Sequence, residues 1–296
     1  MVHEVTAWLT GRNVTSLCDG TVGHGGHAEA LLDRMGVSGT VVGIDRDAEA
    51  LAVCRDRLSR FGTRLILIKG LFLDVRTHLA TAGMSDTDGV LLDLGVSSRQ
   101  LDDPGRGFSF QSDGPLDMRM DQSFGVTAAE LVNTMPEAEL ADLIYQYGEE
   151  RFSRRISRAI VRIRADHPFG TTQELVAAIK GAVPSAYRHG RIHYATRTFQ
   201  ALRIAVNREI ETLEPALRAA VDVLAPGGRL AVLSFHSLED RIVKHTLRSL
   251  SQESENRLAV LTKKPQTPSE QECRTNPRAR SAKLRVAERI SQECLQ

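Results

Sequence analysis

Short apolar runs alternate with helix-like stretches over roughly the first third of the chain. Four of these runs are typical of strands, at Val14–Cys18, Thr40–Ile44, Arg64–Ile68 and Gly89–Leu92. Apolar residues within them are nearly continuous and do not alternate with polar ones, as expected for strands covered on both faces. Strands separated by helices of this length predict βαβ units around a parallel sheet.

This rhythm stops after Gly95 and returns later in the chain. Between these points lie a glycine-rich loop and helical stretches, best defined at Glu137–Tyr147, Arg151–Arg164 and Thr172–Ala182. Beyond them we expect a helix at Asn207–Leu224 that stops at Pro226-Gly-Gly, a strand at Arg229–Phe235, a helix at Leu238–Leu250 and a final strand at Leu258–Lys263. The fold class is therefore α/β, with a helical insertion (104–198) between core segments 1–103 and 199–296.

Cysteine usage and hydropathy exclude several classes of protein. The four cysteines lie far apart with no Cys-x-x-Cys pair, which argues against a zinc site and a disulfide framework. No apolar run approaches the roughly eighteen residues of a membrane-spanning helix. The N-terminus has no basic region followed by an apolar stretch, so we expect no signal peptide. A cytoplasmic protein without a membrane partner is the simplest expectation, and a homodimer is left open.

Positive charge is unevenly distributed, although 38 basic residues nearly balance 37 acidic ones. In the helix expected at Arg151–Arg164, Arg151, Arg155, Arg158 and Arg162 share one face. Such a face binds phosphates or is simply solvated, and the helix alone does not decide between the two. The segment Asn276–Arg285 is also basic and either folds back onto RNA or is a solvated tail.

The densest motif is Asp19-Gly-Thr-Val-Gly-His-Gly-Gly-His27, which follows the first strand and opens a helix. Its glycines, Gly25 and Gly26 among them, let the backbone approach a ligand closely. A dinucleotide site would keep the position of Asp19 open for a pyrophosphate. An acidic residue there is instead compatible with S-adenosylmethionine, which carries a cationic amine and no phosphate. The alternative is a tight structural turn.

Two further residues fit an adenosyl group at this edge of the sheet. Asp45, at the end of the second strand, can accept hydrogen bonds from both ribose hydroxyls, although a helix N-cap is the alternative. Phe72 follows the third strand, where it is placed either to stack on adenine or to join the core. His27 either contacts the ligand or only begins the helix.

The fourth strand leads into Leu91-Leu-Asp-Leu-Gly-Val-Ser-Ser-Arg-Gln100. Ligands of α/β proteins bind outside the carboxyl ends of parallel strands, so Asp93 faces the expected reaction centre. An acceptor there can bind the N–H of an exocyclic amine and later take its proton. The available acceptors in this loop are Asp93, Ser97 and Ser98, with loop capping as the alternative for the two serines. Asp93 and Ser97 are the catalytic candidates. No ligand cluster supports a metal.

Several long motifs resemble one family. They are the glycine loop, the Asp93 loop, Arg106-Gly-Phe-Ser-Phe-Gln-Ser-Asp-Gly-Pro-Leu-Asp-Met-Arg-Met-Asp121, Tyr147-Gly-Glu-Glu150, Ala195-Thr-Arg-Thr-Phe-Gln-Ala-Leu-Arg203, Ser234-Phe-His-Ser-Leu-Glu-Asp-Arg241 and Asn276-Pro-Arg-Ala-Arg-Ser-Ala-Lys-Leu-Arg285. In this order they are similar to bacterial 16S rRNA cytosine-N4 methyltransferases, the RsmH (MraW) family. They span nearly the whole chain and are far more specific than a glycine loop.

The resemblance implies a Rossmann-like class I S-adenosylmethionine methyltransferase whose substrate is a cytosine in the decoding centre of 16S rRNA, in an assembled small ribosomal subunit. The cofactor contacts that it implies are Gly25, Gly26, His27, Asp45, Phe72, Asp93 and Gln100. The insertion would then bind RNA. Candidates to stack on the cytosine are Phe108, Phe110, Phe235 and His236, although phenylalanines are more often core residues.

Three other functions compete with this hypothesis. An NAD-dependent oxidoreductase shares the glycine loop and Asp45 but should lack Asp19 and the Asp93 loop. A methyltransferase for DNA, another RNA or a protein is a second alternative, and the missing Pro-Pro-aromatic run counts against DNA. A non-catalytic ribosome-assembly factor is the third, and measured binding of S-adenosylmethionine would discriminate it.

Overall fold

The computed structural model describes residues 1–253 and 258–290. Its contacts divide the chain into two compact units, which are described separately. The core unit holds Met1–Gly95 and Ile210–Gln296, and the insertion unit holds Val96–Glu209. The insertion unit therefore begins earlier and ends later than the expected 104–198.

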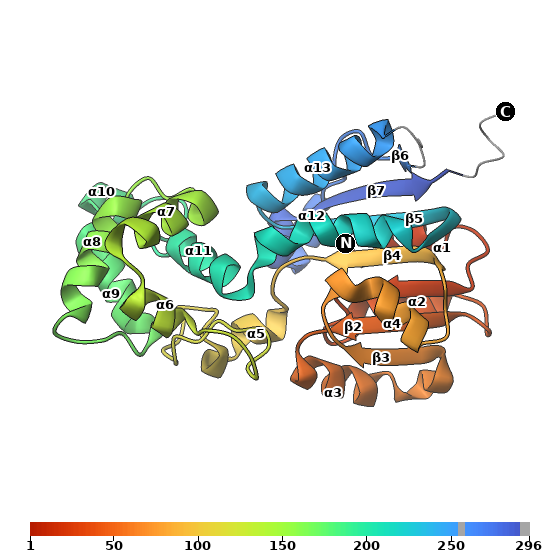
Figure 1. Cartoon of the computed structure of the whole chain (residues 1–296), viewed down its shortest axis with the longest axis horizontal. Coiled ribbons are helices and arrows are strands. Elements are labelled where there is room, and N and C mark those ends of the chain that lie inside the picture. The colour runs from red at the N-terminus through yellow and green to blue at the C-terminus, as the bar shows by residue number, and fades with distance from the viewer. Residues whose placement is uncertain (254–257, 291–296) are drawn as a thin grey trace. The chain divides into compact units, whose positions relative to one another are not determined.

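One seven-stranded sheet forms the centre of the core unit (Figure 1). Its strand order is β3-β2-β1-β4-β5-β7-β6. The strands are β1 (Ser16–Asp19), β2 (Thr40–Asp45), β3 (Leu65–Lys69), β4 (Thr87–Asp93), β5 (Leu224–Ser234), β6 (Leu258–Val260) and β7 (Lys283–Arg289). Strands β1 to β5 pair in parallel, and β7 pairs antiparallel with both β5 and β6. This topology confirms the expected Rossmann-like α/β class.

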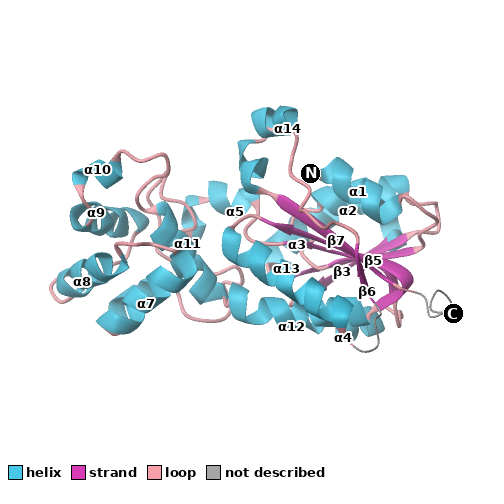
Figure 2. Cartoon of the chain, turned by 90° about the horizontal axis from the view of Figure 1, so that it is seen from above, coloured by secondary structure: helices cyan, strands magenta, loops and turns pink. Residues whose placement is uncertain are grey.

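Helices cover both faces of this sheet, so the core unit has three layers (Figure 2). On one face pack α1 (Val2–Thr10), α2 (Gly26–Arg34) and α3 (Ala48–Arg57), which bury Leu9, Leu31 and Leu51 against the strands. On the other face lie α4 (Val75–Thr81), α12 (Glu209–Asp222) and α13 (Ser237–Gln252), with Leu79, Leu217 and Val243. A short helix, α14 (Glu270–Thr275), precedes β7. Burial on both faces explains the unbroken apolar runs of the strands.

The insertion unit is helical and has its own hydrophobic core. Its helices are α5 (Ser98–Asp102), α6 (Ala128–Thr134), α7 (Glu137–Gly148), α8 (Ser153–Arg164), α9 (Thr172–Ala182), α10 (Ser185–Arg188) and α11 (Thr196–Asn207). Ile144 of α7, Ile156 of α8 and Ile179 of α9 are fully buried in one cluster. Capping boxes at Thr127 and Thr171 fix where α6 and α9 begin. The fold class, including an insertion between the fourth and fifth strands, is confirmed.

Two details of the expected C-terminal half are wrong. Pro226 and the two glycines after it lie within β5 and do not stop a helix, because α12 already ends at Asp222. The expected final strand is not the last one, since β7 follows it and lies between β5 and β6. Leu284 and Val286 of β7 are fully buried, so this part of the basic segment is a structural strand and not a solvated tail.

Candidate active site

The loop between β1 and α2 approaches its surroundings too closely for most side chains. Gly25 is the N-cap of α2 with φ of 82°, a left-handed conformation that favours glycine. A Cβ atom there would lie 2.6 Å from Leu58 Cδ1 and 2.8 Å from Cys54 Sγ. At Gly26 a Cβ would meet nothing within 4 Å, so this first residue of the helix borders open space. The loop thus packs closely against the end of α3 at Gly25 and leaves space free at Gly26.

Three carboxylates end three neighbouring parallel strands, namely Asp19 on β1, Asp45 on β2 and Asp93 on β4. Asp45 holds the glycine loop, because its Oδ2 accepts a bond of 2.8 Å from the Gly23 amide while Oδ1 accepts one from Asp47. The helix N-cap is therefore Asp47 and not Asp45, since the Asp47 side chain accepts from Glu49 and Ala50 at the start of α3. The capping alternative for Asp45 is excluded.

The protein alone does not fully offset the loss of hydration of these three carboxylates. Burial raises the pKa of Asp19 to about 8, with smaller contributions from the charges of Asp93 and Asp45, while a bond from the Thr21 amide opposes the shift. Burial also raises the pKa of Asp45 and that of Asp93. Acidic groups that share a desolvated edge hold their charge best beside a bound cation. The site therefore favours a positively charged ligand over a phosphate.

Asp93 lies beside His27, with 3.4 Å between His27 Nδ1 and Asp93 Oδ2. The Asp93 side chain is 29% exposed, yet its Oδ1 is buried without a hydrogen-bond partner, and so is His27 Nε2. Burial lowers the pKa of His27, against the raising effect of Asp93. Buried polar atoms are nearly always satisfied in folded proteins. The unpartnered Asp93 Oδ1 and His27 Nε2 are consistent with a site in which a cofactor and a substrate supply the missing hydrogen bonds.

Phe72 and Thr21 complete the surroundings of the loop. Phe72 begins the 3-10 turn Phe72–Asp74 after β3, and its Cβ would lie 3.0 Å from a Cβ built on Gly20. Its ring is half-buried and packs against the core cluster, so one residue can serve both the core and a ligand. Thr21 Oγ1 accepts a 2.6 Å bond from the Asp93 amide and ties the loop to β4. Sequence reasoning missed Thr21, whose role depends on a contact between distant strands.

The insertion unit contains Ser97 and Gln100, which bond to each other. Ser97 is the N-cap of α5, and its hydroxyl accepts from the Gln100 amide at 3.2 Å. The Gln100 side chain in turn accepts from the Ser97 amide at 2.9 Å, which completes a capping box. The structure therefore shows the capping role that was the alternative for the serine, and it brings out no second role.

The candidates for stacking on a base are mostly engaged within the protein. Phe108 is 6% exposed in the core of the insertion unit, which makes it a core residue and not a stacking platform. Phe110 stacks on His193 with ring centroids 4.5 Å apart. In the core unit, Phe235 is half-buried, and His236 caps α13 by accepting from the Glu239 amide. The N-cap alternative for His236 is thus observed.

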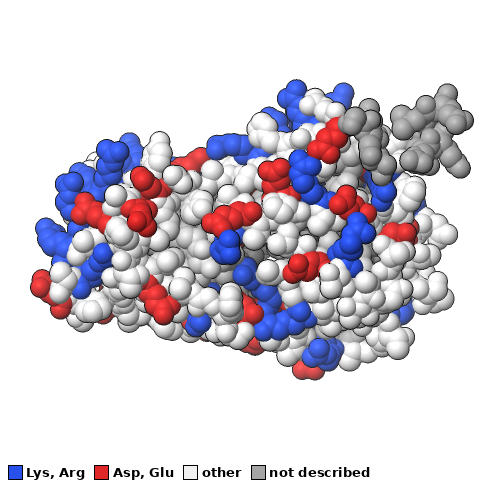
Figure 3. Space-filling model, in the orientation of Figure 1, with Lys and Arg blue, Asp and Glu red and all other residues white. Residues whose placement is uncertain are grey.

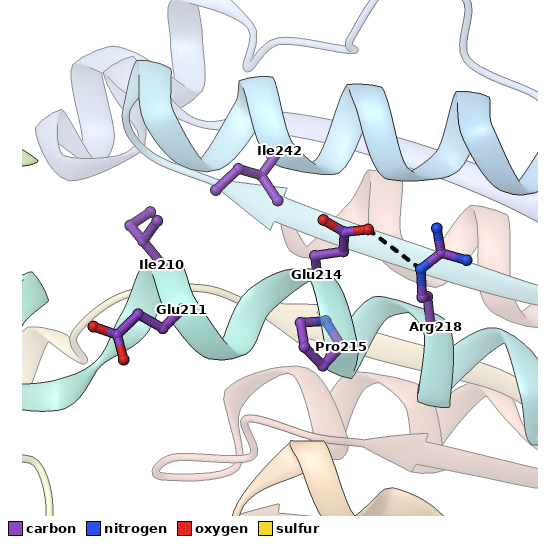
Figure 4. Close-up of a pocket in the computed structure, with 6 residues that line it drawn as sticks. All are labelled: Ile210, Glu211, Glu214, Pro215, Arg218 and Ile242. Carbon is purple, nitrogen blue, oxygen red and sulfur yellow. Dashed lines mark hydrogen bonds and ion pairs between the residues drawn. The ribbon is translucent and has the colours of Figure 1, made fainter. Parts of the chain in front are cut away.

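A groove of about 460 Å³ lies between α12 and α13 (Figure 4). It is lined by Ile210, Glu211, Glu214, Pro215, Arg218 and Ile242, and Glu214 pairs with Arg218. None of the expected site residues lines it. Elsewhere in residues 1–253 and 258–290, no cluster of three or more His, Cys, Asp or Glu side chains is arranged to hold a metal ion. Over the same residues, no helix has the length and apolar character to span a membrane.

The sequence profile of the MraW methylase family matches residues 1–290. The chain belongs to the MraW methylase family. This methylase is therefore an S-adenosylmethionine-dependent methyltransferase, and the acidic edge around the glycine loop fits that cationic cofactor.

Relatives of the methylase match over almost their whole length. It is 51% identical to the Ribosomal RNA small subunit methyltransferase H of Pelobacter propionicus, over 98% of this chain and 97% of the relative. It is 54% identical to the protein of the same name from Synechococcus elongatus, over 93% and 88%. A solved rRNA methylase from Streptococcus thermophilus is 12% identical with a TM-score of 0.47, over 98% of this chain and 96% of that one.

Proposed function

We propose that this methylase transfers a methyl group to the N4 amine of a cytosine in the decoding centre of 16S rRNA, acting in the cytoplasm on small ribosomal subunits. The observation that carries the chemistry is Asp93, which stands at the carboxyl end of β4 with a buried, unpartnered Oδ1. The substrate is supported by the names of relatives that match almost the whole chain, Ribosomal RNA small subunit methyltransferase H.

The cofactor would bind along the carboxyl edge of β1, β2 and β4. Asp45 accepts hydrogen bonds from the ribose hydroxyls, and Phe72 stacks on the adenine. Gly25 and Gly26 allow close backbone approach, and His27 offers its unpartnered Nε2. Gln100 stays a predicted cofactor contact. When bound, S-adenosylmethionine supplies an electrophilic methyl group on a sulfonium.

Asp93 would act directly on the amine that is methylated. The N4 lone pair is delocalised into the cytosine ring, so this amine is a poor nucleophile. By accepting a hydrogen bond from an N–H, Asp93 favours a pyramidal nitrogen whose lone pair points at the methyl carbon. When the bound cofactor gives up its methyl group to N4, Asp93 would take the N4 proton that is lost. Burial raises the pKa of Asp93, which makes it a better proton acceptor than an exposed carboxylate.

Ser97 stays a prediction as a second catalytic group. Its hydroxyl oxygen accepts the bond that caps α5, which leaves its proton free to be donated. A serine in that state donates to the substrate but does not take its proton. We therefore assign proton acceptance to Asp93 and expect Ser97 at most to orient the base. The insertion unit as a whole would form the RNA-binding domain.

The test is transfer of labelled methyl from S-adenosylmethionine to small subunits isolated from cells that lack this protein. Nucleoside analysis should place the label in N4-methylated cytidine. Subunits from wild-type cells, already methylated, are the matched control and should accept almost none. Label in another nucleoside, or equal label in both kinds of subunit, would contradict the assignment of this cytosine as the substrate. Transfer to another purified RNA but not to small subunits would favour the alternative of a different RNA.

A further inference from the structure

The outer face of α8 carries a row of arginines. Arg154, Arg155, Arg158 and Arg162 are exposed and lie within about 100° of one another around the helix, at about 100° per residue. Arg151, just before the helix, is also exposed. These five residues are called the arginine surface. Figure 3 shows basic side chains gathered over the part of the insertion unit that contains α8 and α10.

The buried contacts of α8 do not involve these arginines. The opposite face of α8 supplies the packing, because Ile156 and Ile160 are fully buried there with Ser153 and Ser157. Ser157 also donates to the Glu137 carbonyl of α7 at 2.5 Å. Arg164, at the end of α8, differs from the surface residues, since it donates to the carbonyls of Val132 and Met135 and so caps α6.

The arrangement is unfavourable for the helix itself. Arg154 and Arg155 lie in the first turn, which holds no acidic residue, so two cations face the positive end of the helix dipole. Like charges also recur four residues apart, from Arg154 to Arg158 and on to Arg162. Arg158 pairs with Glu137 at 3.5 Å, with both side chains well exposed, and the other four arginines form no ion pair with any described carboxylate. A bound polyanion would relieve this repulsion.

The end of the arginine surface that lies before α8 is nevertheless held in place. The Arg151 guanidinium lies 4.8 Å from the centre of the Phe152 ring and 5.1 Å from that of Tyr187. Buried Glu150 fixes both rings, because it accepts 2.8 Å from the Phe152 amide and 2.6 Å from the Tyr187 hydroxyl. The Glu150 carboxylate is therefore an internal anchor. Cations that are fixed before binding lose less conformational freedom when a ligand arrives.

We propose that the arginine surface binds the phosphate backbone of ribosomal RNA and orients the methylase on its substrate, an inference that rests on the proposed function. Arg154 and Arg162 are about 12 Å apart along the helix axis at about 1.5 Å per residue. A nucleic-acid duplex carries one charge per roughly 1.7 Å, so this row meets several phosphates at once. The five residues hold no base-reading aromatic, so they contribute position and affinity, not sequence choice.

The test compares Arg154→Gln/Arg155→Gln/Arg162→Gln with a control that removes the same charge elsewhere. Arg55, Lys263 and Lys264 are exposed residues of the core unit and supply that control as a triple glutamine variant. Binding of each protein to small subunits and to protein-free 16S rRNA is measured across a salt series. Removing three phosphate contacts should lower the slope of log affinity against log salt by about three, and the control should leave it unchanged.

Kinetics separate docking from chemistry. The arginine variant should raise KM for small subunits by tenfold or more, while kcat and the affinity for S-adenosylmethionine stay as in the wild type. The unchanged cofactor affinity shows that the core unit of the variant is folded, and an unchanged thermal denaturation curve shows the same for the insertion unit. The matching triple lysine variant keeps the charge and should keep most of the salt slope, which a purely structural role of the arginines would not predict.

The outcomes distinguish this inference from the proposed function. Equal salt slopes for the arginine variant and the control would contradict the proposal that the arginine surface binds RNA. Loss of binding to intact subunits but not to protein-free RNA would mean that it contacts an acidic protein, which also overturns it. A further outcome is that the wild type transfers no methyl group to subunits while the salt slope is still lower in the arginine variant. In that case the proposed function would fail, but the proposal that the arginine surface binds RNA would stand.

Discussion

The core unit and the insertion unit carry their functional charges in opposite ways. In the core unit, carboxylates are withdrawn from water at the ends of the parallel strands, and Asp19 is only 1% exposed. In the insertion unit, arginines extend into water, and the Arg158 side chain is 75% exposed. The first arrangement suits one small cation that enters a desolvated site, and the second suits a large polyanion that stays hydrated.

Different variables should therefore control the two units. Burial shifts a pKa strongly, whereas salt screens buried charges only weakly. Exposed arginines remain charged at any accessible pH, but salt screens them well. Cofactor binding should respond to pH and little to salt, and RNA binding should do the reverse. The five predictions below test this contrast, from the largest expected effect to the smallest.

Asp93→Asn should lower kcat by on the order of 10²- to 10⁴-fold, because the amide is nearly isosteric but cannot take the N4 proton. Single-turnover methyl transfer at saturating cofactor measures it. Asp88→Asn is the matched control at the other end of β4, where Asp88 accepts bonds from the Thr15 and Ser16 amides. That control should lower stability but not kcat. An Asp93→Asn rate within tenfold of the wild type would remove the carboxylate from the chemistry.

Cofactor affinity should rise with pH through the pKa of Asp19. Because burial raises this pKa to about 8, the free protein holds the carboxyl protonated at pH 7. A cationic ligand favours the ionised form, so binding releases up to about one proton at pH 7. Affinity should then grow by as much as about tenfold per pH unit below 8 and level off above it. Calorimetry in buffers of different ionisation enthalpy measures the proton directly.

The same shift sets the pH dependence of folding. The unfolded chain loses the Asp19 proton near the ordinary pKa of 3.8, whereas the folded chain keeps it to about 8. The free energy of unfolding therefore falls as pH rises between these values. In Asp19→Asn, both this fall and the proton release should diminish. A proton release that persists unchanged in Asp19→Asn would assign it to another group, such as Asp45 or Asp93.

The sequence predicted the core unit well wherever local pattern and burial agree. The unbroken apolar runs of β1 to β4 identify parallel strands, and the position of Asp93 at the end of β4 follows from that assignment. β7 was not predicted, because Lys283 and Arg285 interrupt its apolar residues and make the segment resemble a surface tail. Only the fold reveals that Asp240 of α13 accepts from both cations, at 2.9 and 2.7 Å.

Roles that depend on contacts between distant segments could not be predicted from the sequence either. Nothing in the sequence around Glu150 indicates that Tyr187 will bury it, and a carboxylate beside arginines is normally a surface residue. Phe108 was interpreted as a possible base platform because of its motif, but the packing of the insertion unit encloses it. Composition and motif thus identify which residues matter, and the fold decides which of them face a ligand.

Arg285→Gln should lower the free energy of unfolding by about 2 kcal/mol, because this side chain is 6% exposed and bonds to Asp240. The loss stays below that of a fully orphaned buried charge, since Lys283 continues to pair with Asp240. Chemical denaturation measures it. The salt slope of RNA binding should not change, in contrast to the arginines of α8. A lower slope with unchanged stability would mean that Arg285 contacts RNA, which is one of the two interpretations of the segment Asn276–Arg285.

Ser97→Ala should have the smallest effect, about 1 kcal/mol, because it removes the side-chain cap of α5. Asparagine is an equally good N-cap without a hydroxyl, so Ser97→Asn separates capping from chemistry. If Ser97 only caps α5, the asparagine variant should restore both stability in denaturation and kcat in methyl transfer. If stability returned while kcat stayed low, the hydroxyl itself would act on the substrate. Such a result would give the insertion unit a polar catalytic group, so the chemistry would not be confined to the core unit.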